Sequence, residues 1–501
     1  MAPNLDDPDG LVNLRNLTQE VERIAPDDKS VPIVLVPGFL GWGAPLFGAV
    51  NYFGGVIDIP KILVDRGYTV IVASVSPISS NWERACELYR QLTFGQFSTV
   101  NSATGSIDEV HDVDIDYGTY FNADPARAPE QTSGTRITKF ILYATLKAET
   151  WYATISLMAQ GAGNLHPTYF GETERGNWTI SITTLGTPHR GTTIINALES
   201  FLSRSMQQAV GLVARLFATI SFNSPEKRAY DLQLDHWGIR RNSGETFQDM
   251  LIRIESDNGP VWKWLNSDNN GLHDNSIEGV HNPPLNIIKT SEHIYYFSLS
   301  FHATDPFPEI EDFVRLAIGR IPILEGLVDL IIKAFESLGW TFIIASTSFR
   351  SFVEWVTQAV ITRVIKELGY NLVLPNPGSY IPRKDVIPIL LPSVYAMGSQ
   401  DLTDTQRNIL GPNLGDWYQN DGVVNTESMM GPEGYVKKIS ELTDFYFSAA
   451  ETRGFYWHLG VNDQMDHLDQ IGVCIEQGTG DLMQEMYLNI ANLITRLPVG
   501  G

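Results

Sequence analysis

The sequence predicts an α/β protein built on a doubly wound, mostly parallel sheet, and three observations support this prediction. Short apolar runs bounded by turn residues recur along the first 300 residues. Helical patterns separate several of these runs, which is the strand–helix rhythm of a parallel sheet. The chain has 501 residues, of which 43% are hydrophobic, so it can bury a large core.

The apolar residues of each run are continuous rather than alternating, which indicates strands buried on both faces. We predict strands at residues 31–36, 69–75, 137–143, 178–185 and 294–299, with helices such as 82–92 and 150–159 between them. Residues 1–30 are polar and are expected to form a flexible N-terminal arm. The remaining residues, 31–501, are expected to form one domain.

Two helical insertions interrupt the strand–helix rhythm, at about residues 196–256 and 305–370. In an α/β enzyme such insertions usually lie over the carboxyl edge of the sheet. Two interpretations remain open for them, an enlarged core and a lid over an apolar pocket.

The chain is acidic, with 35 Lys and Arg against 58 Asp and Glu and a net charge of −23. Long-range repulsion then disfavours nucleic acid and anionic membrane surfaces as partners. A neutral lipid or ester substrate remains compatible with this charge. With two cysteines, Cys86 and Cys474, the chain has no disulfide framework, although one bridge is possible.

The sequence gives little information about location. We find no basic and apolar signal segment at the N-terminus, which favours an intracellular location, and the compartment and the oligomeric state stay unknown. The longest apolar stretch, 321–345, is broken by four charged residues and suits an amphipathic helix better than a membrane span.

A glycine-rich segment follows the first predicted strand and reads Leu35-Val-Pro-Gly-Phe-Leu-Gly-Trp-Gly43. Glycines allow a tight turn and close approach of the backbone to a ligand. In hydrolases with this kind of sheet, the loop at this position supplies one N–H of the oxyanion hole. Phe39 would supply it here, although the segment taken alone indicates only a turn.

Five further motifs follow in order. They begin at Ser79 (SSNWERACELY), Thr187 (TPHRGT), Leu234 (LDHWGIRR), Asn420 (NDGVVN) and Asp466 (DHLDQIG). Together with the Phe39 loop, this series resembles the thermoalkalophilic bacterial lipases and their eukaryotic relatives over residues 31–300 and 390–475. The resemblance implies an α/β-hydrolase fold with helical cap or lid insertions.

The resemblance also implies a proton-relay pair. Asp421 corresponds to the acid of the catalytic triad, and His467 corresponds to the general base. From local sequence alone, Asp421 in Asp-Gly would be a turn residue and His467 a structural histidine. His189, in Thr-Pro-His, is interpreted as a structural residue of a loop.

The nucleophile position departs from the family pattern. No Gly-x-Ser-x-Gly pentapeptide occurs in the chain, and the register set by Ala148-Glu-Thr places Thr145 in the serine position. Leu146 becomes the second oxyanion donor, and Lys147 replaces a small residue. A β-branched residue is strained in the positive-φ elbow, so catalysis through Thr145 is expected to be impaired. Two explanations of this departure remain open. One is a genuine loss of the nucleophile, and the other is a wrongly translated exon boundary that produced residues near 119–147.

The metal sites implied by the resemblance are also incomplete. Glu83 and Asp235 fall on the two acidic positions of the family's structural zinc site, but residues 119–127 contain none of the expected histidines. Of the calcium site Asp469 remains, and Cys474 stands where an acid is expected. Zinc prefers four ligands that include imidazole or thiolate, so we predict no cofactor.

The resemblance implies hydrolysis of carboxylic esters, either triacylglycerols or other long-chain acyl esters. Two alternatives remain open: a catalytically dead protein that binds lipid in the same apolar pocket, and an acyl thioesterase or acyltransferase of a biosynthetic pathway. Residues 142–150 separate the active from the inactive alternative. The length of the acyl chain is not determined by the sequence.

Overall fold

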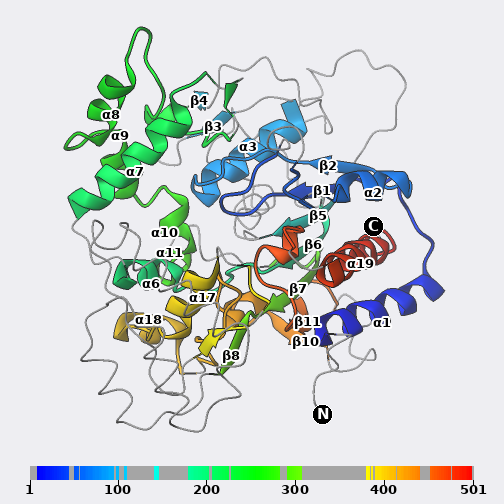
Figure 1. The fold of residues 1–501 in the computed structure, drawn as a ribbon. Coiled ribbons are helices and arrows are strands. Elements are labelled where there is room, and N and C mark those ends of the chain that lie inside the picture. The colour runs from blue at the N-terminus through cyan, green and yellow to red at the C-terminus, as the bar shows by residue number, and fades with distance from the viewer. Residues whose placement is uncertain are drawn as a thin grey trace, which may run out of the picture.

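The computed structural model describes residues 8–43, 50–55, 57–94, 98–100, 107–109, 140–145, 179–201, 206–224, 227–228, 230–281, 290–306, 380–383, 385–387, 390–412, 414–439, 452–474 and 477–498. The predicted insertion at 305–370, the predicted helix at 150–159 and the positions Leu146 and Lys147 lie wholly or almost wholly outside this part of the chain. The termini of the molecule and the arrangement of its layers are shown in Figure 1.

The strands of the described chain form one large sheet and two small ones. The strands are β1 Ile33–Val36, β2 Val70–Val72, β3 Ser98–Val100, β4 Ile107–Glu109, β5 Phe140–Thr145, β6 Thr179–Leu185, β7 Tyr295–Phe301, β8 Thr304–Pro306, β9 Tyr380–Pro382, β10 Val436–Lys438 and β11 Tyr456–Asn462.

The helices of the described chain are α1 Asp9–Ile24, α2 Ile59–Asp65, α3 Asn81–Phe94, α6 Ile194–Phe201, α7 Met206–Ser221, α8 Phe247–Glu255, α9 Pro260–Leu265, α10 Gly271–Asn275, α11 Ile277–Val280, α17 Leu391–Gly398, α18 Asp404–Leu410 and α19 Gln477–Ile494. The described chain also has the short 3₁₀ helices η4 Asp235–Trp237, η6 Thr426–Met430 and η9 Asp469–Ile471. None of the described helices combines the length and the apolar character that crossing a lipid bilayer requires.

The large sheet has seven strands in the order β10-β11-β7-β6-β5-β1-β2, and all neighbouring pairs are parallel. The five predicted strands correspond to β1, β2, β5, β6 and β7, and the predicted helix at 82–92 corresponds to α3. Residues of β1, β6 and β7 are buried along their whole length. The α/β-hydrolase type of fold expected from the sequence is therefore confirmed.

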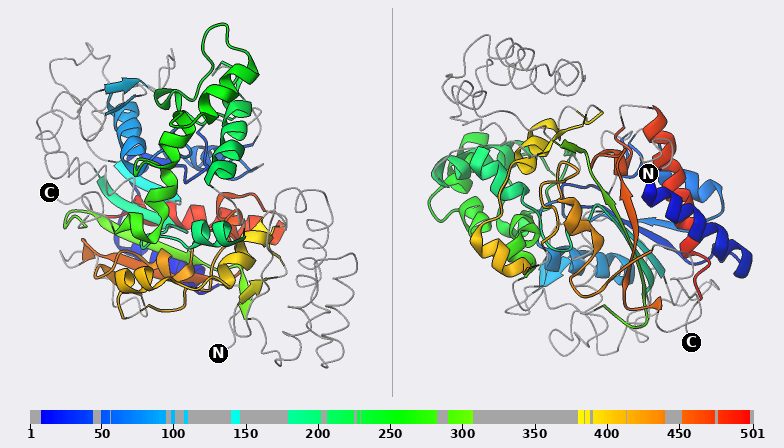
Figure 2. Two further views of the ribbon diagram at one scale, coloured as in Figure 1. Left: turned by 90° about the vertical axis from the view of Figure 1, so that its left-hand side faces the viewer. Right: turned by 90° about the horizontal axis from the view of Figure 1, so that it is seen from below.

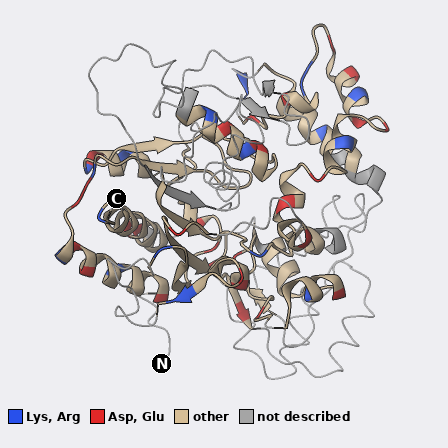
Figure 3. Ribbon diagram, turned by 180° about the vertical axis from the view of Figure 1, so that it is seen from behind, with Lys and Arg blue, Asp and Glu red and all other residues tan. Residues whose placement is uncertain are grey.

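Charge is almost excluded from this sheet. Among its seven strands only β10 carries charged residues, Lys437 and Lys438, at one edge (Figure 3). A central strand has neighbours on both sides and helices on both faces, so a charge there would have to be buried. Because such a buried charge is unfavourable, the central strands appear in the sequence as runs without charged residues.

Helices α1, α2 and α19 cover one face of the sheet. Helix α3 and the helices between β6 and β7 lie on the other side (Figure 2, right). The main core lies beneath the first group, where side chains of α1, α2 and α19 pack on β1, β7 and β11. Both faces are thus covered, as a parallel sheet requires.

Helix α1 differs from the arm expected at residues 1–30. Leu11, Leu14, Leu17 and Val21 are buried in the main core against β11 and α19. The expectation is wrong for this helix because its apolar residues recur at helical spacing and form one continuous stripe. Charged residues of the helix, such as Asp9, Glu22 and Arg23, are exposed, whereas the polar Thr18 is buried.

Helices α7 and α8 of the insertion at 196–256 form a helical layer beside the sheet together with α9, which follows the insertion. Helices α7, α8 and α9 pack on one another and enclose an apolar cluster of their own, which includes Phe217, Met250 and Trp264 (Figure 1). Phe39, from the loop after β1, packs against this cluster. We refer to α7, α8 and α9 as the helical layer. Whether it acts as a lid stays a prediction.

Candidate active site

The order of the strands identifies one edge of the sheet as the place for a ligand. The chain runs from β1 outward to β2 and then returns to the other side of β1 with β5. At such a reversal the two connections diverge, and a crevice opens at the carboxyl ends of the strands. Val36 and Ala144 are paired across β1 and β5, so the loops that follow these two strands begin side by side.

Asp421 lies at this carboxyl edge in a tight loop closed by a bridge between Asn420 and Asn425. Its side chain is completely buried. One carboxylate oxygen, Oδ1, accepts hydrogen bonds from the backbone N–H groups of Val423, at 3.0 Å, and Val424, at 2.8 Å. These bonds fix the carboxylate, so that its second oxygen points out of the loop.

The second oxygen meets His467. The distance between Asp421 Oδ2 and His467 Nδ1 is 2.6 Å, and the backbone N–H of His467 also donates to Asp421 O at 2.9 Å. An ionised carboxylate only accepts hydrogen bonds, so Nδ1 carries the proton. The other ring nitrogen, Nε2, is then the one able to accept a proton. The structure therefore brings together the two residues that the sequence pairs.

The turn that carries His467 is held by Asp466. Asp466 Oδ1 accepts hydrogen bonds from the N–H groups of Leu468 and Asp469, at 2.9 and 3.0 Å. Such a capped turn places residues three apart on the same side. Gln470, three residues after His467, accordingly donates from Nε2 to Asp421 Oδ2 at 2.7 Å. Sequence reasoning does not find Gln470, although its spacing from His467 is a usable signal.

Thr145 is the last residue of β5 and is paired with Leu185 of β6, so its backbone lies at the carboxyl edge. The side chain of Thr145 and the whole of Leu146 are outside the described part of the structure. Phe39 follows β1 by three residues at the same edge. The roles of Thr145, Leu146 and Phe39 therefore stay predictions, with the backbone positions of Thr145 and Phe39 described.

His189 occupies a separate place beneath the loop after β6. Its Nε2 lies 3.1 Å from Thr184 Oγ1, and its ring packs edge-on against Tyr456 at 4.7 Å between ring centres. Burial, with a smaller contribution from the neighbouring His458, lowers the pKa of His189 to about 3. An imidazole with this pKa stays neutral, which agrees with a structural residue.

The two residues at the family's zinc positions have protein partners. Glu83 Oε1 accepts from Asn269 Nδ2 at 2.7 Å and lies 3.1 Å from His236 Nε2, and Asp235 Oδ1 lies 3.5 Å from Arg228 Nη1. The described residues contain no group of three or more His, Cys, Asp or Glu able to hold a metal ion. Residues 119–127 lie outside the description. The donors among the described residues do not by themselves fit a four-ligand zinc site, so the absence of zinc stays a prediction.

Asp469, the residue at the family's calcium position, also has hydrogen-bond partners within the protein. The backbone N–H of Asp466 donates to Asp469 Oδ2 at 2.9 Å, and the Cys474 thiol donates to Asp469 O at 3.6 Å. Burial, together with the charge of Asp466, raises the pKa of Asp469 to about 8. Cys86 and Cys474 are both free thiols, so the bridge left open by the sequence is not formed.

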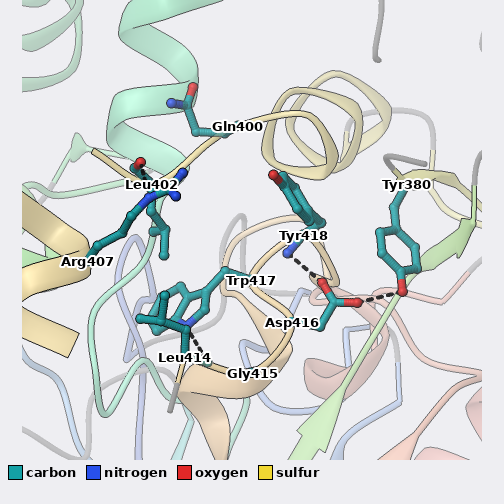
Figure 4. A pocket seen from close by; sticks show the side chains of 9 residues that line it. All are labelled: Tyr380, Gln400, Leu402, Arg407, Leu414, Gly415, Asp416, Trp417 and Tyr418. Atoms are coloured by element: carbon teal, nitrogen blue, oxygen red, sulfur yellow. Dashed lines mark hydrogen bonds between the residues drawn. The ribbon is translucent and has the colours of Figure 1, made fainter. Parts of the chain in front are cut away.

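A pocket of about 400 Å³ lies beside the chain that leads to Asp421. Asp416 closes one side of it by accepting a hydrogen bond from Tyr380 Oη at 2.6 Å, while Arg407 lies on the other side (Figure 4). Trp417, in its floor, accepts at its carbonyl oxygen a bond from Asn425 Nδ2 at 2.6 Å. Trp417 therefore connects the lining of the pocket to the loop that holds Asp421.

Fold and site together define a hydrolase-type α/β protein with a buried carboxylate–imidazole pair at the carboxyl edge of the sheet. The chain belongs to the lipase family, because the family model described as "Lipase-like, C-terminal domain" matches residues 29–297. The family resemblance predicted from the sequence is thus confirmed. Asp421 and His467 lie beyond the matched residues.

The chain is similar to the lipase of Staphylococcus epidermidis, with 27% identity over 257 residues, or 50% of this chain and 35% of that protein. It is also similar to lipase 1 of Staphylococcus aureus strain MRSA252, with 27% identity over 256 residues and the same coverage. The chain thus spans about a third of the length of these curated relatives.

Among solved structures, lipase 1 from Pelosinus fermentans is similar, with 26% identity, a TM-score of 0.56 and coverage of 94% of this chain and 99% of that chain. The Staphylococcus hyicus lipase has a TM-score of 0.57 at 20% identity and covers 95% and 97% of the two chains. The latter likeness supports the fold alone.

Proposed function

We propose that this protein hydrolyses carboxylic esters that carry a hydrophobic acyl chain, as expected for a member of the lipase family. The observation that carries the proposal is the buried contact of 2.6 Å between Asp421 Oδ2 and His467 Nδ1 at the carboxyl edge of the parallel sheet. The relatives that are themselves named lipases support the choice of ester substrates.

In the proposed reaction the Thr145 hydroxyl attacks the acyl carbonyl while His467 Nε2 takes its proton. Asp421 holds the imidazole in the required tautomer and stabilises the imidazolium. The N–H groups of Phe39 and Leu146 hold the oxyanion. His467 then passes the proton to the departing alkoxide, and water releases the acid from Thr145. A threonine in the elbow is strained, so we expect slow turnover.

We also propose that the protein works without zinc or calcium. The support is that Glu83 and Asp235 already have Asn269, His236 and Arg228 as partners, and that Asp469 bonds within its own turn. Chelator treatment is then expected to leave the melting temperature unchanged. A fall that added zinc or calcium reverses would contradict this part.

The activity is tested with p-nitrophenyl esters of graded acyl length. We expect turnover to vanish in His467→Ala, to fall by about 10⁴-fold in Asp421→Asn, and to stop in Thr145→Ala. Thr145→Ser removes the β-branch and should raise kcat. His293→Ala changes an exposed histidine outside the site and is the matched control.

A second candidate is a protein that binds acyl lipid without hydrolysing it, and the missing Ser-x-Gly elbow favours it. Absence of wild-type turnover, combined with saturable binding of a fluorescent fatty acid, would select this candidate. Turnover that survives in both His467→Ala and Thr145→Ala would contradict the proposed chemistry.

A further inference from the structure

The backbone of the Phe39 loop is held on both sides. The N–H of Gly38 donates to Tyr52 Oη at 3.0 Å, and the N–H of Leu40 donates to Pro77 O at 2.8 Å. Leu40 O accepts from Tyr230 Oη at 2.8 Å. Leu40 adopts a φ of 61°, an uncommon conformation for a leucine. Such a conformation persists only where the surroundings determine it.

One determinant is Arg84 of α3, whose side chain is completely buried. Its Nη2 donates to Pro37 O at 2.5 Å and lies 3.3 Å from Gly38 O. Its Nη1 donates to Ser76 O, in the loop after β2. One guanidinium therefore joins the two loops that begin at the carboxyl ends of β1 and β2.

Arg84 has an acidic neighbour in the same helix, Glu87, and burial raises the pKa of that carboxyl group to about 8. Glu87, three residues later, accepts the N–H of Ser76 at 2.7 Å. Burial lowers the pKa of Arg84 to about 10, and the charge of Glu87 opposes that shift. A planar guanidinium presents its N–H groups in a fixed fork, whereas a lysine is a single point charge. The contact with several carbonyl oxygens is therefore specific to arginine.

The bond from Arg84 to Gly38 O, together with the bond from Gly41 N–H to the same oxygen at 3.1 Å, also fixes the direction of Phe39 N–H. In a planar trans peptide the C=O and the next N–H point in opposite directions. Because Gly38 O faces Arg84, the N–H of Phe39 faces away from it. We propose that Arg84 is a positioning residue that aims the Phe39 N–H at the acyl oxygen of the substrate. A flipped peptide would instead present a carbonyl oxygen and repel the oxyanion. This inference rests on the proposed function.

Arg84→Lys is the informative variant, because it keeps the charge and loses the fork. We expect kcat for a p-nitrophenyl ester to fall about 100-fold, the effect of one lost oxyanion donor, with KM within about twofold of wild type. Arg253→Lys is the control: Arg253 donates to Gly238 O at 2.9 Å and Arg240 O at 2.6 Å in a loop outside the site. An unchanged kcat in Arg84→Lys would overturn the inference.

Amide hydrogen exchange provides a readout that needs no turnover. The Gly38 and Leu40 amides are expected to be protected in the wild type and to exchange at least tenfold faster in Arg84→Lys, while residues 295–301 of β7 stay unchanged. Unprotected loop amides in the wild type would overturn the inference even if the variant does not fold. An inactive wild type whose loop loosens in Arg84→Lys would sink the proposed hydrolysis and leave the positioning role of Arg84 intact.

Discussion

At the scale of single residues, Asp421 shows how a buried charge is accommodated. Its two oxygens together accept four hydrogen bonds, from Val423, Val424, His467 and Gln470. A buried carboxylate with fewer donors would be costly. Gln470 therefore stabilises the negative charge of Asp421 that faces His467. Replacing Gln470 is expected to affect the imidazole of His467.

We expect Gln470→Leu to lower kcat by about tenfold, the value of one hydrogen bond to a charged group. With one donor fewer, the Asp421 carboxylate holds the imidazole of His467 less firmly. The measurement is kcat for a p-nitrophenyl ester. Tyr487→Phe, which loses the bond from Tyr487 Oη to Gln470 O at 3.0 Å, is the control. An unchanged kcat in Gln470→Leu would exclude this role of Gln470.

Gly186 provides the second residue-scale prediction. It has a φ of 55°, and a Cβ there would lie 2.2 Å from Gln470 Oε1. Gly186→Ala should therefore displace Gln470 in addition to straining the backbone. Gly244, with a φ of 76° and nothing within 4 Å of its Cβ position, isolates the backbone effect. We expect urea unfolding to show Gly186→Ala as less stable than Gly244→Ala by about 1–3 kcal/mol. Equal losses would contradict the contact.

The pair Asp421 and His467 was predicted through the family resemblance of the motifs that contain them, whereas their local sequence alone favoured a turn residue and a structural histidine. The sequence did not predict Gln470 or Arg84, because a motif does not state which carboxylate or carbonyl a neutral amide or a guanidinium will reach. Both depend on loops that meet only after folding. The role of Thr145 as the nucleophile stays a prediction, and the structure describes only its backbone position at the end of β5.

At the scale of elements, strands with uninterrupted apolar runs were predicted and β11 was not. Its sequence, YWHLGVN, contains a histidine and a glycine inside the run. The histidine, His458, is buried, and burial lowers its pKa to about 4, with the charge of Lys438 adding to the effect. The strand tolerates His458 because its ring stays neutral between β10 and β7.

Two of the buried histidines, His458 and His189, make stability depend on pH. An unfolded histidine binds a proton below its ordinary pKa of about 6.5, whereas in the folded protein these pKa values are lowered to about 4 and about 3. The unfolded chain then holds more protons between pH 6.5 and 4, so this contribution to stability is lost as pH falls through that window.

His458→Gln should make the fall in unfolding free energy shallower by up to one proton, about 1.4 kcal/mol per pH unit. The measurement is urea unfolding at several pH values between 6.5 and 4. Glu87 and Asp469, whose pKa values are raised to about 8, titrate with the opposite sign in every variant and cancel in the comparison. The exposed His293→Gln should leave the slope unchanged. An unchanged slope in His458→Gln would contradict the assignment.

At the scale of the whole molecule, the first and last helices are one packing unit. Arg15 donates to Glu485 at 2.9 Å, Thr18 Oγ1 lies 3.2 Å from Asn489 O, and Arg496 donates to Ala25 O at 2.8 Å. Beneath these bonds, Leu14 is fully buried in the main core. The polar composition of residues 1–30 led to the prediction of an arm, whereas the spacing of the leucines is that of an amphipathic helix.

Leu14→Ala should lower the free energy of unfolding by about 2–5 kcal/mol, since it leaves a cavity in the core. Leu216→Ala, at a position of α7 that is 55% exposed, should change it by less than about 0.5 kcal/mol. Urea unfolding followed by circular dichroism measures both. A small loss in Leu14→Ala would mean that residues 9–24 behave as the arm expected from composition.

The pairing of α1 with α19 constrains how the protein is made. The hydrogen-bonded partners are up to 471 residues apart. At a ribosomal rate of about 5–20 residues per second, the leucine stripe of α1 waits roughly 25–95 seconds for the segment that covers it. During that interval the apolar stripe of α1 is open to chaperones, and this part of the native core closes only after α19 has been made.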